Sequence, residues 1–230
     1  MNSDNHMLVC PTTKLGLKSM TREQAEERLG RPLHARPDLV NAKGGVSKAA
    51  GVTETVLLRE DDKCAYPIVD GFPVLLAPEV LTTEDDLPFD LTDPRYAEAY
   101  EEMDFYNVAA AKMVDVIAHG GIEAVMPLEM GTTDAEKSSF PEPWDRWVDT
   151  VFDSAALWDV YSHLSPVRGK TVLQVGGTGG HAVKFSLVGA SESWLVTPVV
   201  GEAAIARGLA ESAGLGERYK IVVGIAEELP

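Results

Sequence analysis

The chain has 230 residues and a formal net charge of −16, because 36 acidic residues face 20 basic ones. This length suits one large domain or two small ones, and the composition is that of an ordinary globular protein. Such an excess of carboxylates is repelled by phosphate backbones, which predicts that no nucleic acid is a partner. No apolar run nears the roughly 20 residues that span a bilayer, so no membrane association is expected. Two cysteines and no recognisable signal peptide predict a cytoplasmic location.

Residues 1–84 predict a small β-rich module. Short apolar runs at 8–11, 55–58 and 66–76 are typical of strands, and Pro and Gly separate them. Asp70-Gly71 lies between two apolar pairs and predicts a tight turn, because Gly tolerates positive φ. The segment between the first two runs, about 19–54, predicts an insertion that contains a helix from Thr21 to Leu29.

Residues 85–165 predict a helical connection. Asp93-Pro94 opens its first helix, because Pro at the first helical position loses no hydrogen bond. Tyr96, Tyr100 and Tyr106 follow on this helix. They are candidates for a lid over a pocket, but helical spacing explains them equally well as packing aromatics, and we favour packing.

Residues 166–230 change period and predict alternating strands and helices. Continuous apolar strands are expected at 171–175, 193–197 and 219–223, with helices at 181–188 and 201–212 between them. This β-α-β-α-β order predicts a parallel sheet with right-handed crossovers, and therefore an α/β fold.

The loop from Gly176 to Gly180 follows the first of these strands and opens the first helix. Glycines there permit a sharp turn, and they also let a ligand approach main-chain N–H groups. A turn with no ligand would need the same residues, but the complete strand-loop-helix context favours binding. A dinucleotide fingerprint fits Gly177, Gly179 and Ala182, yet Thr197 stands where that fingerprint needs a ribose-binding acid. An NAD(P)-dependent oxidoreductase is therefore the third of three hypotheses.

The stretch Val172–Gly180 resembles the first motif of class I S-adenosylmethionine-dependent methyltransferases, and Ile221–Pro230 resembles their third motif, in the form common among ubiquinone/menaquinone-type enzymes. The resemblance implies a Rossmann-like fold, S-adenosylmethionine as cofactor and a small-molecule methyl acceptor. The residues that it implies for cofactor binding are Gln174, Gly176, Gly177, Thr178, Gly179, Gly180, Thr197, Ile225 and Ala226.

Four of these positions depart from the family pattern. Gln174 replaces an acid, Thr178 a glycine, Thr197 the ribose-binding acid and Ile225 the adenine-contacting aspartate. Two hypotheses follow: a divergent methyltransferase that holds its cofactor mostly by backbone, or a catalytically degenerate methyltransferase-like interaction or activator protein. No catalytic residue is assigned. His163 and His181 are expected to be ordinary surface or helix-start residues. Glu202 is a candidate to replace the missing ribose-binding acid, but we favour an acid that stabilises the start of its helix.

The run from Cys10 to Leu15, together with Tyr66–Leu76, resembles the small zinc-ribbon-like activator subunit of methyltransferases, in its metal-free bacterial type. Zinc-bearing members use four cysteines, and a structural zinc site needs four ligands. This chain offers Cys10 and Cys64, while His6 and His34 have no knuckle spacing, so no zinc is expected. Relatives of this module partner a methyltransferase domain, and the resemblance implies one downstream here.

The methyltransferase resemblance also implies a seven-stranded sheet, and this chain ends after the third strand. We therefore expect an incomplete, N-terminal half of the domain. The open edge of its first strand is an aggregation liability. We expect missing C-terminal sequence, a second copy or another chain to cover it.

Overall fold

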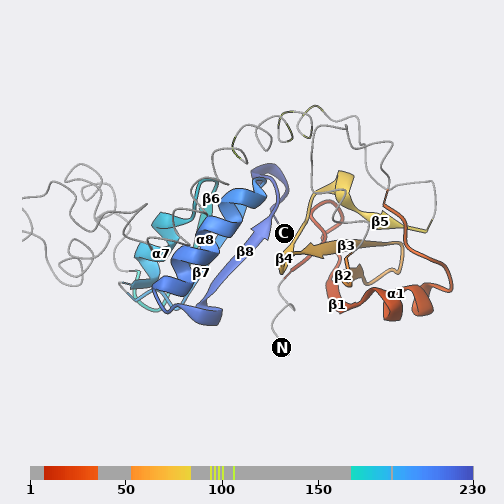
Figure 1. The fold of residues 1–230 in the computed structure, drawn as a ribbon, viewed down its shortest axis with the longest axis horizontal. Coiled ribbons are helices and arrows are strands. Elements are labelled where there is room, and N and C mark those ends of the chain that lie inside the picture. Colours follow the sequence, from red (N-terminus) through yellow and green to blue (C-terminus); the bar gives the residue numbers. More distant parts are fainter. Residues whose placement is uncertain are drawn as a thin grey trace, which may run out of the picture. The chain divides into compact units, whose positions relative to one another are not determined.

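The computed structural model describes residues 8–35, 53–83, 167–187 and 189–229, and five helical positions at 94, 96, 98, 100 and 106 (Figure 1). The chain divides into two compact units. The first comprises residues 1–107 with 196–200 and 222–230, and the second comprises 108–195 with 201–221. The expected domain boundaries near 84 and 165 fall outside the described residues and stay predictions.

The N-terminal module is a curled antiparallel sheet. Its strands follow the order β1-β2-β3-β4, and β5 pairs with β3. The strands are β1 (Leu17–Thr21), β2 (Thr55–Arg59), β3 (Cys64–Val69), β4 (Phe72–Pro73) and β5 (Leu81–Thr82). Strand β3 is central because it pairs with β2, β4 and β5. Almost all of its side chains are buried, which fits its continuous apolar sequence.

The strands predicted at 55–58 and within 66–76 are found as β2, β3 and β4, although β4 ends at Pro73, and the run at 8–11 is not a strand. Only Val9 forms a bridge there, with Gly16. Strand β1 begins outside the predicted insertion and runs into it, and the sequence pattern missed it. The reason is that β1 lies at the edge of the sheet and buries little apart from Leu17, so it carries no apolar run.

The predicted turn and helix of the module both have the expected local chemistry. Asp70 and Gly71 have φ of 51° and 84°, the pair of positive values that a two-residue hairpin turn requires. Helix α1 (Arg22–Leu29) starts at Thr21, whose hydroxyl accepts the Gln24 N–H in a capping box. Its buried Ala25 packs in a core cluster whose buried members also include Leu33, Val56, Leu58, Ala65 and Leu81.

The last region is a three-stranded parallel sheet in the order β6-β7-β8, so the α/β prediction is confirmed. The elements are β6 (Thr171–Val175), α7 (Gly180–Leu187), β7 (Glu192–Thr197), α8 (Val200–Ser212) and β8 (Tyr219–Val223). They lie within a residue or two of the predicted bounds. The core of the second unit contains Ala182, Val183, Leu195, Ile205, Ala206, Leu209, Ala210, Leu215 and Tyr219.

Strand β6 differs from its neighbours in exposure. Leu173 and Val175 are each 48% exposed, whereas β7 buries most of its side chains. Among the described residues β6 pairs only with β7. What covers its other edge stays a prediction, and the Rossmann-like assignment of the whole sheet does too.

The first unit contains a backbone link between the module and the end of β8. Val74 and Val223 form a parallel bridge, and the Leu75 N–H donates to the Val223 carbonyl at 2.7 Å. The next residue, Gly224, donates its N–H to the Thr197 carbonyl at 3.0 Å. The chain that leaves β4 therefore pairs with the chain that leaves β8.

The five described positions between 94 and 106 are helical, as Asp93-Pro94 predicts for the start of this connection. The rest of the predicted helical connection, including the second helix expected before residue 165, lies outside the described residues. Within the described part of the chain, no helix has both the length and the apolar character needed to cross a membrane.

If the Leu75–Val223 hydrogen bond holds the module to β8, the amide proton of Leu75 should exchange slowly with solvent. Its donor is satisfied by the Val223 carbonyl, and the Leu75 side chain is 1% exposed, so exchange requires local opening. Native-state hydrogen exchange followed by NMR measures this directly. Exchange of Leu75 at the rate of an unprotected amide of the unfolded chain would contradict the pairing.

Candidate functional site

The glycine loop between β6 and α7 has a backbone that only glycine adopts easily. Gly176, Gly177 and Gly179 have φ of 76°, 73° and 79°. The loop tip at Gly177 is exposed, whereas Gly179 and Gly180 are buried. A Cβ on Gly176 would meet no atom within 4 Å, so this side of the loop has room for a ligand against the main chain.

Gln174 holds the loop from its own strand. Its Nε2 donates to the Gly176 carbonyl at 2.8 Å, and its Oε1 accepts the Ala182 N–H at 2.9 Å. The side chain thus joins the start of the loop to the first turn of α7. A carboxylate here could accept from Ala182 but could not donate to Gly176, so the amide is the group that fits.

Gly179 lies at the base of the loop, where the backbone approaches the core closely. The Tyr219 hydroxyl donates to the Gly179 carbonyl at 2.9 Å. A Cβ on Gly179 would lie 2.2 Å from that hydroxyl and 2.7 Å from the Ala206 Cβ. This glycine is therefore needed for packing between the loop and the helix α8, whatever the loop binds.

Replacing Gly179 by Ala should lower the free energy of unfolding more than replacing Gly177 by Ala. Both substitutions place a Cβ on a left-handed backbone, which costs about 1 to 2 kcal/mol. Only the first also collides with the core, for a total of about 3 kcal/mol or more. Urea unfolding of both variants measures the difference, and equal losses would show that the close approach at Gly179 is wrong.

The other predicted site residues follow β7 and β8. Thr197 is fully buried, and its hydroxyl accepts the Val199 N–H at 3.2 Å. Ile225 is 5% exposed, and the exposed Ala226 begins a 3-10 turn that ends at Glu228. Neither Thr197 nor Ile225 offers a carboxylate, so a ligand at these strand ends depends on main-chain groups and shape.

The structure keeps the predicted residues in two groups. Gln174 and the residues from Gly176 to Gly180 belong to the second unit, with Thr178 half-buried at the loop tip. Thr197, Ile225 and Ala226 belong to the first unit. His181 is exposed on α7 and Glu202 lies in the first turn of α8, while His163 lies outside the described residues.

Two of the three tyrosines of the 94–106 helix bind carboxylates. The Tyr96 hydroxyl lies 2.8 Å from both carboxylate oxygens of Glu228, and the Tyr100 hydroxyl donates to Glu79 Oε1 at 2.6 Å. Tyr106 is 44% exposed. Tyr96 is 4% exposed, which fits the favoured packing interpretation, while the lid over a pocket stays a prediction. Sequence reasoning missed both glutamates, although the four-residue spacing of the two tyrosines was a usable signal.

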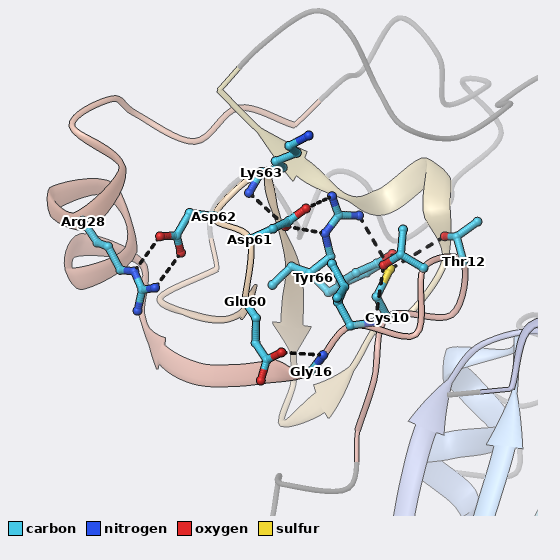
Figure 2. Close-up of polar contacts among 12 residues, drawn as sticks. Cys10, Thr12, Gly16, Arg28, Glu60, Asp61, Asp62, Lys63 and Tyr66 are labelled. Carbon is cyan, nitrogen blue, oxygen red and sulfur yellow. Dashed lines mark hydrogen bonds and ion pairs between the residues drawn. The ribbon is translucent and has the colours of Figure 1, made fainter.

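In the module, the turn after Cys10 meets the turn after β2 around a buried guanidinium (Figure 2). Arg59 is 1% exposed and forms two hydrogen bonds to Asp61, at 2.7 and 2.9 Å. Its Nη1 also lies 3.8 Å from the Cys10 sulfur, which is 3.2 Å from the Tyr66 hydroxyl. The turn after Cys10 and the turn after β2 are thus joined by an internal cation.

This arrangement separates the properties of the two thiols. Burial alone raises the pKa of Cys10, but hydrogen bonds from Thr13 and Tyr66 and the nearby Arg59 outweigh it and lower the pKa to about 7. Burial raises the pKa of Cys64 to about 12. The Arg59–Asp61 hydrogen bonds hold the pKa of Asp61 below its usual range.

No cluster of three or more His, Cys, Asp or Glu side chains suited to a metal ion occurs among the described residues. The cation that does face the Cys10 sulfur is the Arg59 guanidinium. A divalent ion beside it would be repelled by a charge that the chain already supplies. The absence of zinc stays a prediction.

Cys10 should make the stability of the protein depend on pH. Its folded pKa of about 7 lies below the ordinary value of 9.0, so the unfolded chain binds more protons between these values and stability rises with pH. Its contribution is complete above about pH 9 and is lost as pH falls through 7. We expect a gain of about 2 kcal/mol between pH 6.5 and 9.

Urea unfolding of the native chain and of Cys10→Ser at several pH values measures this gain as the difference between the two proteins. Cys64→Ser is the matched control, because the pKa of Cys64 is raised and its thiol is protonated in both states through most of this range. A native chain and a Cys10→Ser variant with parallel pH profiles would contradict the Cys10 assignment.

No family profile matches the chain, and no curated protein matches it either. Among solved structures, the chain is similar to one from Pyrococcus horikoshii described as a "putative RNA methyltransferase". The identity is 24% and the TM-score 0.27, over 44% of this chain. The match spans 47% of the archaeal chain, which is about half of its length. This likeness concerns the fold alone.

The comparison corrects one expectation. The net charge of −16 led to the prediction that nucleic acid is not a partner, but the archaeal structure carries the description of an RNA methyltransferase. Net charge is a sum over the whole chain and does not fix the charge of the surface that a partner contacts. The exclusion of nucleic acid was therefore wrong.

Proposed function

We propose that this chain binds S-adenosylmethionine and takes part in methyl transfer. The observation that supports this most is the loop after β6, where glycines with positive φ leave main chain open to a ligand in front of α7. Each other predicted site residue also lies at the carboxyl end of a strand of the parallel sheet. Ligands of open α/β sheets bind at these ends.

The residues present fit a cofactor held by backbone rather than by carboxylates. Gln174 fixes the loop with an amide that is already engaged at both ends, so the main-chain N–H groups of the loop are presented in a fixed shape. Bound S-adenosylmethionine would supply an activated methyl group. The contribution of this chain is then to position the methyl donor, which is a large part of the work in an in-line displacement.

A second candidate function is a methyltransferase-like interaction protein without activity. Two observations favour it. The side chains of Gln174 and Thr197 form hydrogen bonds with nearby main-chain groups of this chain, and the family's acids are replaced at both positions. Without a carboxylate to hold the ribose or the methionine amine, affinity for the cofactor falls. The two candidates differ in one measurable property, which is binding of the cofactor by the natural chain.

Titration of the full chain with S-adenosylhomocysteine in a calorimeter tests the proposal. We expect saturable one-site binding by the natural chain. Gln174→Glu should weaken binding by about tenfold, because a carboxylate opposite the Gly176 carbonyl loses one hydrogen bond and adds repulsion, a cost of about 1 to 3 kcal/mol.

The control is Glu211→Gln, which changes the charge by one unit at an exposed position in the last turn of α8. If the natural chain shows no binding, and binding appears only after Thr197→Asp and Ile225→Asp restore the missing acids, the inactive interaction protein is the better account. Stronger binding by Gln174→Glu would show that the amide is not the group that shapes the loop.

A further inference from the structure

The segment that follows β8, from Gly224 to Leu229, is held by groups from distant parts of the sequence. The Gly224 N–H donates to Thr197, and the Lys14 Nζ donates to the Leu229 carbonyl at 2.8 Å. Between these points, the carboxylate of Glu228 accepts the Tyr96 hydroxyl. Lys14 comes from the first turn of the module, and Tyr96 comes from the helix after it.

Tyr96 does not act alone on its helix. Tyr100 lies four residues later, which places both side chains on the same face of the helix. Tyr96 points to Glu228, and Tyr100 points to Glu79, which ends the 3-10 turn Ala77–Glu79 of the module. One face of one helix therefore binds a carboxylate of the module and a carboxylate of the segment after β8.

Both hydrogen bonds are accepted by buried carboxylates. Glu79 is 2% exposed, Glu228 is 8% exposed and Tyr96 is 4% exposed. A buried carboxylate that loses a donor keeps its charge in a medium of low polarity, which is costly. Burial, and next to it the Glu79 carboxylate, raises the pKa of Tyr100 well above its ordinary value, so the phenol stays protonated and donates.

We propose that Tyr96 and Tyr100 are positioning residues that tie the module to the segment after β8, and thereby hold Ile225 and Ala226 in the conformation that a cofactor's adenine would meet. Neither tyrosine touches Ile225 or Ala226 through these bonds. They act through Glu228, which closes the 3-10 turn that Ala226 begins. The part of this inference that concerns the adenine rests on the proposed function, whereas the tie itself does not.

The proposed link through both tyrosines predicts an effect that simple packing does not. The Tyr100 hydroxyl binds Glu79 of the module, and Tyr100 is a helical residue four positions after Tyr96. Removing its hydroxyl should therefore loosen the segment after β8 at a distance. A tyrosine that only filled space would, as phenylalanine, leave that segment unchanged.

The test compares Tyr96→Phe, Tyr100→Phe and the matched control Tyr106→Phe, whose ring is 44% exposed, in the full chain. Hydrogen exchange is measured at residues 225–229, with the core of α8 around Ala206 and Leu209 as internal reference. We expect exchange at 225–229 about tenfold faster in each of the first two variants, from the loss of a hydrogen bond to a charged group. The control and the reference amides should be unchanged.

A second arm uses the partner of Tyr96. In a Glu228→Gln background the charge-assisted bond is already weakened, so adding Tyr96→Phe should accelerate exchange by less than it does in the natural chain. Equal effects in both backgrounds would contradict the Tyr96–Glu228 link. Exchange at 225–229 that is the same in Tyr100→Phe as in Tyr106→Phe would overturn the tie.

A third arm measures the dissociation constant for S-adenosylhomocysteine in the same variants, at a temperature where all are folded by circular dichroism. We expect Tyr96→Phe and Tyr100→Phe to bind about tenfold more weakly than Tyr106→Phe. If the natural chain does not bind the compound, the proposed function fails, but the exchange arms still decide on the tie. Faster exchange with unchanged affinity would refute the positioning role.

Discussion

The hydrogen bond from Leu75 to Val223 links the main chain of the module to the end of β8. It continues the pairing of the module past β4 and brings two segments about 150 positions apart in the sequence into one backbone ladder. A main-chain bond of this kind fixes register as well as proximity. The contacts of Lys14 with Leu229 and of Tyr96 with Glu228 are made with the segment that follows this pairing. The module is thus paired through its main chain with the end of β8, directly before the segment that carries Ile225 and Ala226.

At the candidate sites, the interior of this protein contains buried polar groups that form hydrogen bonds with one another. A buried arginine, a buried thiol and two buried glutamates each have named partners, and Gln174 has one at each end of its amide. Buried polar groups that are paired favour one arrangement, because a shift would break these hydrogen bonds. The apolar clusters around Ala25 and Leu209 supply the burial, and the polar pairs decide which loop conformation goes with it.

The elements that the sequence predicts well are those with one clear period and a local signal at each end. β6, α7, β7, α8 and β8 fall in this class, as do the Thr21 cap and the Asp70-Gly71 turn. β1 was missed because an edge strand with polar side chains has no apolar run. The roles of Gln174 and Arg59 were not predictable from spacing. Gln174 binds Gly176 and Ala182 because the glycine loop folds back over its side chain, and Arg59 reaches Cys10, 49 positions away. Neither arrangement has a signature in residue spacing.

The glycine loop shows the same division. Its existence and its place before a helix follow from local sequence, whereas the need for glycine at position 179 comes from Tyr219 and Ala206, some 40 and 27 positions later. Likewise the tyrosines of the 94–106 helix could be placed on one face from their spacing, but their carboxylate partners at 79 and 228 could not be identified. A site prediction made from one segment is incomplete when the residues that contact it come from other segments.

The buried Arg59 has a consequence for how the module is assembled. A metal ion that joins two turns stabilises the fold more as its free concentration rises, and a chelator can remove it. The guanidinium of Arg59 is part of the polypeptide, so its pairing with Asp61 and Cys10 is independent of supply and survives dilution. The link that Arg59 makes between the two turns therefore requires only the folded chain.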